Sequence, residues 1–189
     1  MADLFSIFLT SVFVNNLMLR QFLGVSPYTL LCGSVRSALA MGAAMTVVLT
    51  SSSIASWYLH RYVLQPFGAE YLYILAFVLV ILLAAYCTEL LLKKALPSVY
   101  SSADAFLPSI GTNCAVLGLV ILNLRKGYGL TETIVHSIGA ALGLTLALVL
   151  IAGIMERLKL NGESRYFQGI PHALIIASIL SIIFQLLVF

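Results

Sequence analysis

Six apolar segments, each long enough to cross a bilayer, limit what this chain can fold into. A helix needs roughly 20 apolar residues to span a hydrocarbon core of about 30 Å. Segments of that length occupy approximately residues 4–23, 37–59, 71–92, 105–124, 131–155 and 169–189. Of the 189 residues, 61% are hydrophobic and 9% are charged, whereas soluble domains are about 25% charged. The sequence therefore predicts an all-α integral membrane protein with six transmembrane helices in a single membrane domain, residues 1–189.

The composition also excludes several functions. The ten Lys and Arg residues are spread thinly between apolar segments, whereas a nucleic-acid-binding protein gathers them on one face. The sequence contains no phosphate-binding glycine loop, metalloprotease motif, nucleophile elbow or dinucleotide fingerprint. We therefore expect no nucleic-acid partner and assign no catalytic residue to the chain itself.

The first and fourth segments are interrupted by amide side chains and glycines. Asn15 and Asn16 precede Gly24 in the first segment, and Asn113 lies between two glycines in the fourth. Each interrupted segment is followed by two ordinary apolar helices, which predicts two three-helix repeats, approximately residues 1–95 and 96–189. Because three spans are an odd number, the second repeat is inserted upside down, and broken helices at matching places point to a site near the membrane midplane. Alternatively, the amides simply join helices by hydrogen bonds.

The three cysteines, Cys32, Cys87 and Cys114, show no C-x-x-C spacing. A disulfide framework is therefore not expected. A single buried cysteine is more often a small apolar residue than a ligand, and we apply that interpretation to Cys32 and Cys87. Cys114 lies inside a broken segment and is a candidate ligand. His136 has no partner at ligand spacing and receives no role.

The basic residues between the segments predict the orientation, because Lys and Arg favour the cytoplasmic side. The first, third and fifth loops hold six of them, and Arg20, placed at the inner end of the first helix, makes seven. The second and fourth loops hold three. We therefore expect both termini on the periplasmic side of a bacterial inner membrane.

Several sequence runs resemble the RnfA/NqrE family, which Rnf electron-transport complexes share with sodium-pumping NADH:quinone reductase. The similarity extends along essentially the whole chain, and the most specific run is Thr112 to Gly118. The other matching runs are Val14-Asn15-Asn16, Phe22-Leu23-Gly24, Thr88-Glu89, Phe106-Leu107-Pro108 and Glu156-Arg157-Leu158.

The resemblance implies a membrane subunit of an ion-translocating oxidoreductase. In such a complex, electron flow between ferredoxin or flavodoxin and NAD(H) is coupled to Na⁺ or H⁺ translocation. It further implies an RnfE-like partner inserted the opposite way up, other Rnf subunits that carry flavin or iron–sulfur groups, and contact with membrane lipid. The two homologous subunits jointly hold an iron–sulfur cluster of the 2Fe-2S type, each providing two ligands from its broken helices. On this basis Cys114 is a ligand, and Asn15, Asn16, Gly24 and Asn113 surround the cluster.

The sequence departs from the family at its first ligand position, where Ser26 replaces cysteine. Iron–sulfur clusters prefer thiolate, and a serine oxygen is a harder and more basic donor. Ser26 is either an oxygen ligand, or is replaced by Cys32 six residues further on, or marks an altered or lost cluster. Two alternative functions stay open: a secondary transporter of the inverted-repeat type, and a structural subunit without a cluster.

Overall fold

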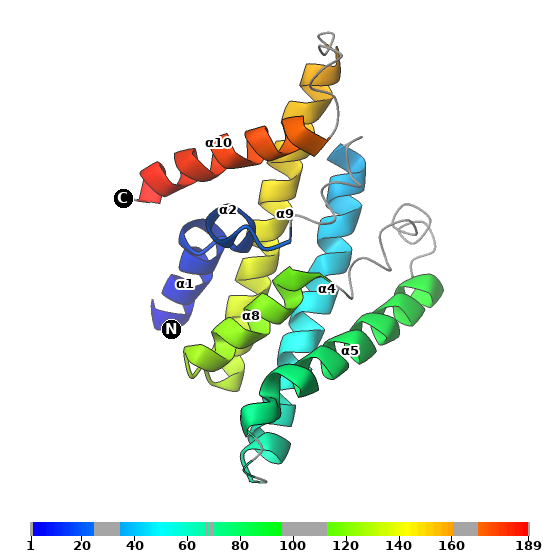
Figure 1. Ribbon diagram of the computed structural model, residues 1–189, viewed down its shortest axis with the longest axis vertical. Coiled ribbons are helices and arrows are strands. Elements are labelled where there is room, and N and C mark those ends of the chain that lie inside the picture. The colour runs from blue at the N-terminus through cyan, green and yellow to red at the C-terminus, as the bar shows by residue number, and fades with distance from the viewer. Residues whose placement is uncertain are drawn as a thin grey trace.

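The fold is described by a computed structural model that covers residues 2–24, 35–66, 68, 70–95, 113–160 and 170–188. Over these residues the chain is almost entirely helical and contains no strand. Figure 1 shows two long helices, α4 (Val35–Leu59) and α9 (Leu130–Leu160), running through the centre of the molecule. Around them lie α1 (Ala2–Leu9), α2 (Leu17–Gln21), α5 (Tyr73–Ala95), α8 (Cys114–Arg125) and α10 (Ile170–Val188).

Three described helices are long and apolar enough to cross a membrane. They cover Val35–Leu64, Tyr73–Leu90 and Leu130–Leu158. The first of these includes η2 (His60–Leu64), a π-helical turn that continues α4, and a short 3₁₀ turn, η3 (Glu70–Leu72), precedes α5. The second, third and fifth predicted segments therefore form helices near their expected bounds, and α10 matches the sixth.

The first predicted segment is not one continuous helix. α1 passes into a π-helical turn, η1 (Thr10–Val14), in which the Asn15 N–H donates to the Thr10 carbonyl at 2.7 Å. The helix then stops, and α2 begins after Asn16 in a new direction. In the fourth segment the described helix, α8, begins only at Cys114. The predicted interruption at Asn15–Asn16 is thus confirmed, and the part of the fourth segment before Asn113 lies outside the described residues.

Close packing of α4 on α9 forms the core. Met41, Met45 and Leu49 of α4 are fully buried, as are Leu144 and Ile151 of α9. The two helices approach closely at Gly42, where a Cβ atom would lie 2.3 Å from Thr145 Cγ2. In hydrocarbon, helix association depends on such close packing by small residues, because lipid tails are as apolar as the side chains.

Glycines on α9 likewise allow the backbone of the first helix to pack closely against α9. A Cβ atom at Gly139 would lie 3.0 Å from the Phe8 carbonyl oxygen, and one at Gly143 would lie 2.8 Å from the Val12 carbonyl oxygen. Because backbone atoms cannot move aside as a side chain can, these positions accept only glycine without a shift of the helices.

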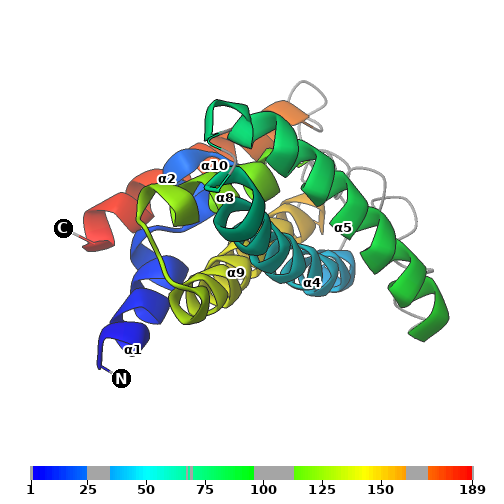
Figure 2. The same cartoon turned by 90° about the horizontal axis from the view of Figure 1, so that it is seen from below.

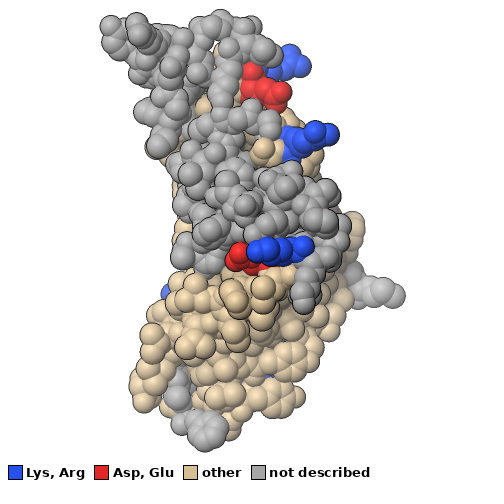
Figure 3. All heavy atoms as spheres, turned by 90° about the vertical axis from the view of Figure 1, so that its right-hand side faces the viewer, with Lys and Arg blue, Asp and Glu red and all other residues tan. Residues whose placement is uncertain are grey.

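The outer helices are apolar on their exposed sides. α5 packs on α4 and α8, while α10 packs on α9 and α2 (Figures 1 and 2). Leu75 and Leu79 of α5, and Ile182 and Leu186 of α10, are more than half exposed. Figure 3 shows charged side chains mainly in one half of one face, with a broad uncharged surface in the other half. Exposed apolar surface of this extent fits contact with lipid or with other membrane subunits.

The glycine contacts predict a sharp difference between two positions on α9. Gly143→Ala places a methyl group against the Val12 carbonyl, whereas at Gly153 the nearest atom to an added Cβ is 3.9 Å away. Overpacking typically costs about 1–3 kcal/mol, so we expect Gly143→Ala to lower the thermal stability of the detergent-solubilised protein. Gly153→Ala is the matched control and should leave stability unchanged or slightly higher. Equal melting temperatures for the two variants would contradict this packing.

Candidate functional site

The first helix break is held together by the side chain of Asn16. Its Oδ1 accepts hydrogen bonds from the Met18 N–H at 3.1 Å and the Leu19 N–H at 3.4 Å, and so caps α2. Its Nδ2 donates to the Gly143 carbonyl at 2.7 Å, which ties the break to α9. The side chain is buried, and a capping amide satisfies backbone N–H groups that have no helical partner.

Asn113 has the same capping role in the fourth segment. Its Oδ1 accepts a hydrogen bond from the Ala115 N–H at 2.9 Å at the start of α8. Its Nδ2 lies 3.9 Å from the Met45 sulfur on α4, and the side chain is buried. Each predicted break therefore ends in a buried asparagine that begins a new helix. Asn16 also joins two helices, so the two interpretations of the amides, site-forming and helix-joining, are compatible in this residue.

The turn that follows the first break and the start of α8 meet in space although they lie far apart in the sequence. The Gly24 N–H donates to the Cys114 sulfur at 3.3 Å, across 90 residues of chain. A Cβ atom at Gly24 would lie 3.0 Å from Leu144 Cδ1 and 3.2 Å from Ala115 Cβ. Gly24 also has a φ of 88°, which favours glycine. Only glycine therefore allows the turn after α2 to approach the start of α8 this closely.

The meeting point lies at the middle of the longest helix. Gly143 and Leu144, which contact the two breaks, are 13 and 14 residues from the first residue of the 31-residue α9. We call this meeting point of Gly24 with Cys114, beside Gly143 and Leu144, the junction. At 1.5 Å per residue the junction is about 20 Å from one end of α9 and about 25 Å from the other. If α9 spans the bilayer, the junction lies near the midplane.

The Cys114 thiol is exposed at this junction, whereas its neighbours Asn113, Ala115 and Val116 are buried. It is the first residue of α8, so its sulfur lies at the positive end of the helix dipole, where negative charge is favoured. The Gly24 N–H supplies a further donor to the sulfur. This environment suits a thiolate ligand that faces away from the chain's own core.

Comparison with known proteins identifies the family. A family model described as "Rnf-Nqr subunit, membrane protein" matches residues 4–189. The chain belongs to the Rnf-Nqr family. One relative, a component of the ion-translocating oxidoreductase complex of Syntrophotalea carbinolica, is 42% identical over 185 residues, covering 98% of this chain and 96% of the relative. Another, a component of the Na⁺-translocating ferredoxin:NAD⁺ oxidoreductase complex of Acetobacterium woodii, is 39% identical over 178 residues, covering 94% and 93%. The resemblance inferred from the sequence runs is thus confirmed, and the protein is a multi-pass membrane protein.

Not all the residues predicted for an Rnf-Nqr site can be placed. Asn16, Gly24, Asn113 and Cys114 come together at the junction. Ser26 lies outside the described residues, as does Cys32, so the departure at the first ligand position stays a prediction about ligand chemistry. Cys87, expected to pack as a small apolar residue, is exposed on α5. That expectation was wrong for the single chain, because the smooth apolar pattern of α5 does not reveal which side faces the core.

Arg20 occupies a different place from the one expected. The sequence places it at the inner end of the first helix, whereas it lies on α2, one turn beyond the break. Its guanidinium donates to the Asn15 Oδ1 at 2.9 Å and to the Val14 carbonyl at 3.4 Å. Asn15 therefore contacts Arg20 and does not cap a helix. The adjacent Asn16 contacts the middle of α9, so if α9 spans the bilayer, Arg20 lies too deep to count among the basic residues that set the orientation.

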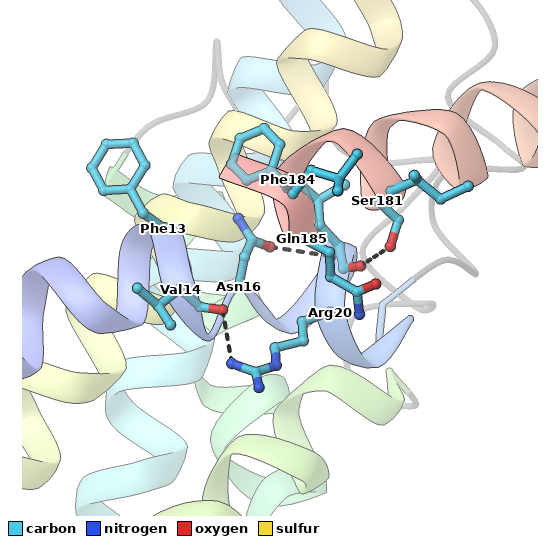
Figure 4. A pocket seen from close by; sticks show the side chains of 10 residues that line it. Phe13, Val14, Asn16, Arg20, Ser181, Phe184 and Gln185 are labelled. Carbon is cyan, nitrogen blue, oxygen red and sulfur yellow. Dashed lines mark hydrogen bonds between the residues drawn. The ribbon is translucent and has the colours of Figure 1, made fainter. Parts of the chain in front are cut away.

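Arg20 also lines a cavity of about 400 Å³ between η1, α2 and α10, shown in Figure 4. Phe13 and Phe184 form apolar walls, and Gln185 and Ser181 add polar groups. The Ser181 hydroxyl donates to the Leu19 carbonyl, which fixes α10 on α2. α10 thus supports the first break directly, a contact that the sequence did not indicate.

A buried polar cluster near the start of α9 is not evident from the sequence. His136 Nδ1 lies 2.6 Å from Asn123 Oδ1, and Asn123 Nδ2 donates to the Ser137 hydroxyl at 3.3 Å. The partner of His136 is on another helix, α8, 13 residues away, so ligand spacing along the chain does not reveal it. The available signal was the set of polar side chains at the end of one apolar helix and the start of the next.

The two asparagines can be tested against a neighbouring amide. We expect Asn16→Ala and Asn113→Ala to lower the free energy of unfolding by about 1–3 kcal/mol, because each removes a cap and strands buried N–H groups. Asn16→Ala should cost more, since it also removes the Gly143 hydrogen bond. Thermal unfolding of the detergent-solubilised protein measures both.

Asn15→Ala is the matched control, because the Asn15 side chain contacts the exposed Arg20. Its effect should stay within about 0.5 kcal/mol, as for most surface substitutions. A loss of stability in Asn15→Ala equal to that in Asn16→Ala would show that the breaks do not depend on capping.

Proposed function

We propose that this chain is a membrane subunit of an Rnf-type complex that carries electrons across the membrane between ferredoxin or flavodoxin and NAD(H). Electron flow is coupled to translocation of Na⁺ or H⁺, and the chain has no catalytic activity alone. The names of its relatives support this function. The observation that carries it is the contact between Gly24 and the exposed Cys114 sulfur, midway along α9.

The proposed architecture is six spans in two inverted repeats. The helix contacts support it, because they correspond in pairs. α8 of the second half packs on α4, and η1 of the first half packs on α9. In the same way α5 packs on α8, and α10 packs on α2. Each half therefore places its broken helix against the long helix of the other half, which is the arrangement expected of two repeats related by a pseudo-two-fold axis.

The proposed orientation rests on fewer basic residues when Arg20 is left out of the count. The first, third and fifth loops then hold six basic residues, and the second and fourth hold three. The excess still favours cytoplasmic odd-numbered loops and termini on the periplasmic side of the inner membrane.

We further propose that Cys114 is one ligand of an iron–sulfur cluster of the 2Fe-2S type. The donor environment fits, because the thiol is exposed, lies at a helix N-terminus and accepts the Gly24 N–H. Hydrogen bonds to sulfur and the local charge both tune cluster potentials. When bound, such a cluster would accept and release single electrons. Asn16 and Asn113 hold the two half-helices, and Gly24 lets them approach.

The remaining ligands must come from elsewhere. Among the described residues, no group of three or more His, Cys, Asp or Glu side chains could hold a metal ion. Because Cys114 faces outward, a partner chain is well placed to complete the site, and an RnfE-like subunit is the proposed partner, beside subunits that carry flavin and iron–sulfur groups. Within this chain Ser26 is the first candidate for the second ligand, ahead of Cys32.

The test is Cys114→Ala in the purified complex, with iron and sulfide analysis and low-temperature EPR. We expect loss of one cluster signal and of the corresponding iron, because a methyl group cannot coordinate it. Cys87→Ala is the matched control, since this thiol is also exposed but lies on α5, and it should keep full iron content. Full iron and an unchanged signal in Cys114→Ala would exclude this ligand and favour a transporter or a structural subunit.

A further inference from the structure

A second cavity lies where α4 continues into η2, α8 ends and α9 begins. Its volume is about 540 Å³. Its lining includes three residues with buried hydroxyl oxygens, Ser53, Ser56 and Thr133. Arg61, His60 and Gln65 of η2 and the following turn line another part, and Phe77, Val120 and Leu124 provide apolar wall.

These hydroxyl oxygens are buried and have no hydrogen-bond partner among the described residues, and each of the three residues is at most 2% exposed. Ser52, which does not line the cavity, is the other side chain with a buried unpartnered oxygen in the described part of the chain. Elsewhere on α4, Thr46 and Thr50 bond the carbonyl one turn earlier. An unsatisfied buried polar group costs about 1–3 kcal/mol. Three such groups around one cavity would be satisfied by a ligand that exchanges hydrogen bonds with hydroxyls.

The charges around the cavity favour an anion. Arg61 lines the cavity, and its guanidinium donates to the Gln65 Oε1 at 3.4 Å. Lys126 lies nearby, with its Nζ 5.2 Å from the centre of the Tyr128 ring. The positive end of α9 also begins here. One acidic side chain lies close by, because the Glu132 carboxylate accepts the N–H of the lining residue Gly129 at 2.9 Å. No Asp or Glu is itself among the described lining residues.

With the junction at the bilayer midplane, the cavity lies at the depth of the headgroup region. Thr133 is 11 residues from Leu144 on α9, or about 16 Å along the helix, while half of the hydrocarbon core measures about 15 Å. Aromatic side chains gather at this level. The ring centroids of Trp57 and Tyr58 are 5.3 Å apart, and the Tyr58 ring stacks on the Tyr62 ring with centroids 5.9 Å apart. The Trp57 indole N–H donates to the Tyr128 carbonyl at 3.2 Å. Trp and Tyr are enriched at membrane–water interfaces.

We propose that this cavity binds the headgroup of an anionic phospholipid that carries free hydroxyls, of the phosphatidylglycerol type. The phosphate pairs with Arg61, and the glycerol hydroxyls exchange hydrogen bonds with Ser53, Ser56 and Thr133. The apolar wall at Phe77, Val120 and Leu124 accepts the first part of an acyl chain. The site is independent of Cys114 and of any cluster, so it goes beyond the proposed electron-transfer role.

The test uses the whole complex in phosphatidylcholine nanodiscs that contain a small fraction of photoactivatable phosphatidylglycerol. Cross-linked peptides are quantified by mass spectrometry, with photoactivatable phosphatidylcholine as the reference probe. We expect preferential labelling by phosphatidylglycerol of peptides that contain residues 53–65 and 120–133. Arg61→Gln should reduce it about fivefold, the factor that corresponds to about 1 kcal/mol per basic residue near a membrane surface.

Two further variants make the result specific. Arg125→Gln is the matched control, because it removes the same charge from the exposed end of α8 without touching the cavity lining, and it should leave labelling unchanged. The Ser53→Ala, Ser56→Ala double variant removes two unpartnered hydroxyls, so it should fold at least as well as the natural protein yet lose the preference for phosphatidylglycerol over phosphatidylcholine.

Competition experiments distinguish a lipid headgroup from a free phosphate as the bound group. Excess unlabelled phosphatidylglycerol should abolish the labelling, and inorganic phosphate should not. Equal labelling by the two lipid probes would overturn the proposal, as would equal losses in Arg61→Gln and Arg125→Gln. Competition by inorganic phosphate but not by the lipid would show a free-anion site and would overturn it as well.

Discussion

Non-helical backbone inside hydrocarbon must find hydrogen bonds within the protein, because no water is there to supply them. This chain interrupts its first segment at Asn16 and begins α8 after Asn113, and the two amide side chains satisfy the N–H groups at these helix starts. Asn16 also holds the break against the Gly143 carbonyl. The capping amides therefore stabilise these helix starts, which in turn bring Gly24 to Cys114 midway along α9.

The glycines complete this arrangement because they allow short distances between the packed segments. Gly42 lets α4 approach Thr145, Gly143 admits η1, and Gly24 fits against Leu144 and Ala115. A site at the centre of a membrane protein needs such close approach, since every added methyl group would separate the half-helices. The result is an exposed Cys114 thiol midway along α9, next to Gly24. A group shared between two chains requires this kind of half-site, whereas a metal site within one chain would gather its ligands inward.

Most helix bounds and the first helix break could be predicted from the sequence. The other features depend on contacts between segments that are distant in the sequence. Long apolar runs predicted the approximate bounds of α4, α5, α9 and α10, because the bilayer thickness limits helix length. The amides and glycines predicted where the first helix breaks. The pattern could not place Arg20, because a break changes the depth of every residue after it. Nor could it show that Ser53, Ser56 and Thr133 share one cavity, since they belong to different helices.

Cross-linking in native membranes would test most directly whether the two broken segments meet. A Cβ atom at Gly118 would lie 2.4 Å from Leu23 Cδ1, so a Leu23→Cys, Gly118→Cys double variant should form a disulfide rapidly on mild oxidation, identified by peptide mass spectrometry. A Leu23→Cys, Gly153→Cys variant, with its second thiol on a distant turn of α9, should not. Absence of the first cross-link in correctly inserted protein would contradict a junction between the two half-helices and, with it, the proposed shared site.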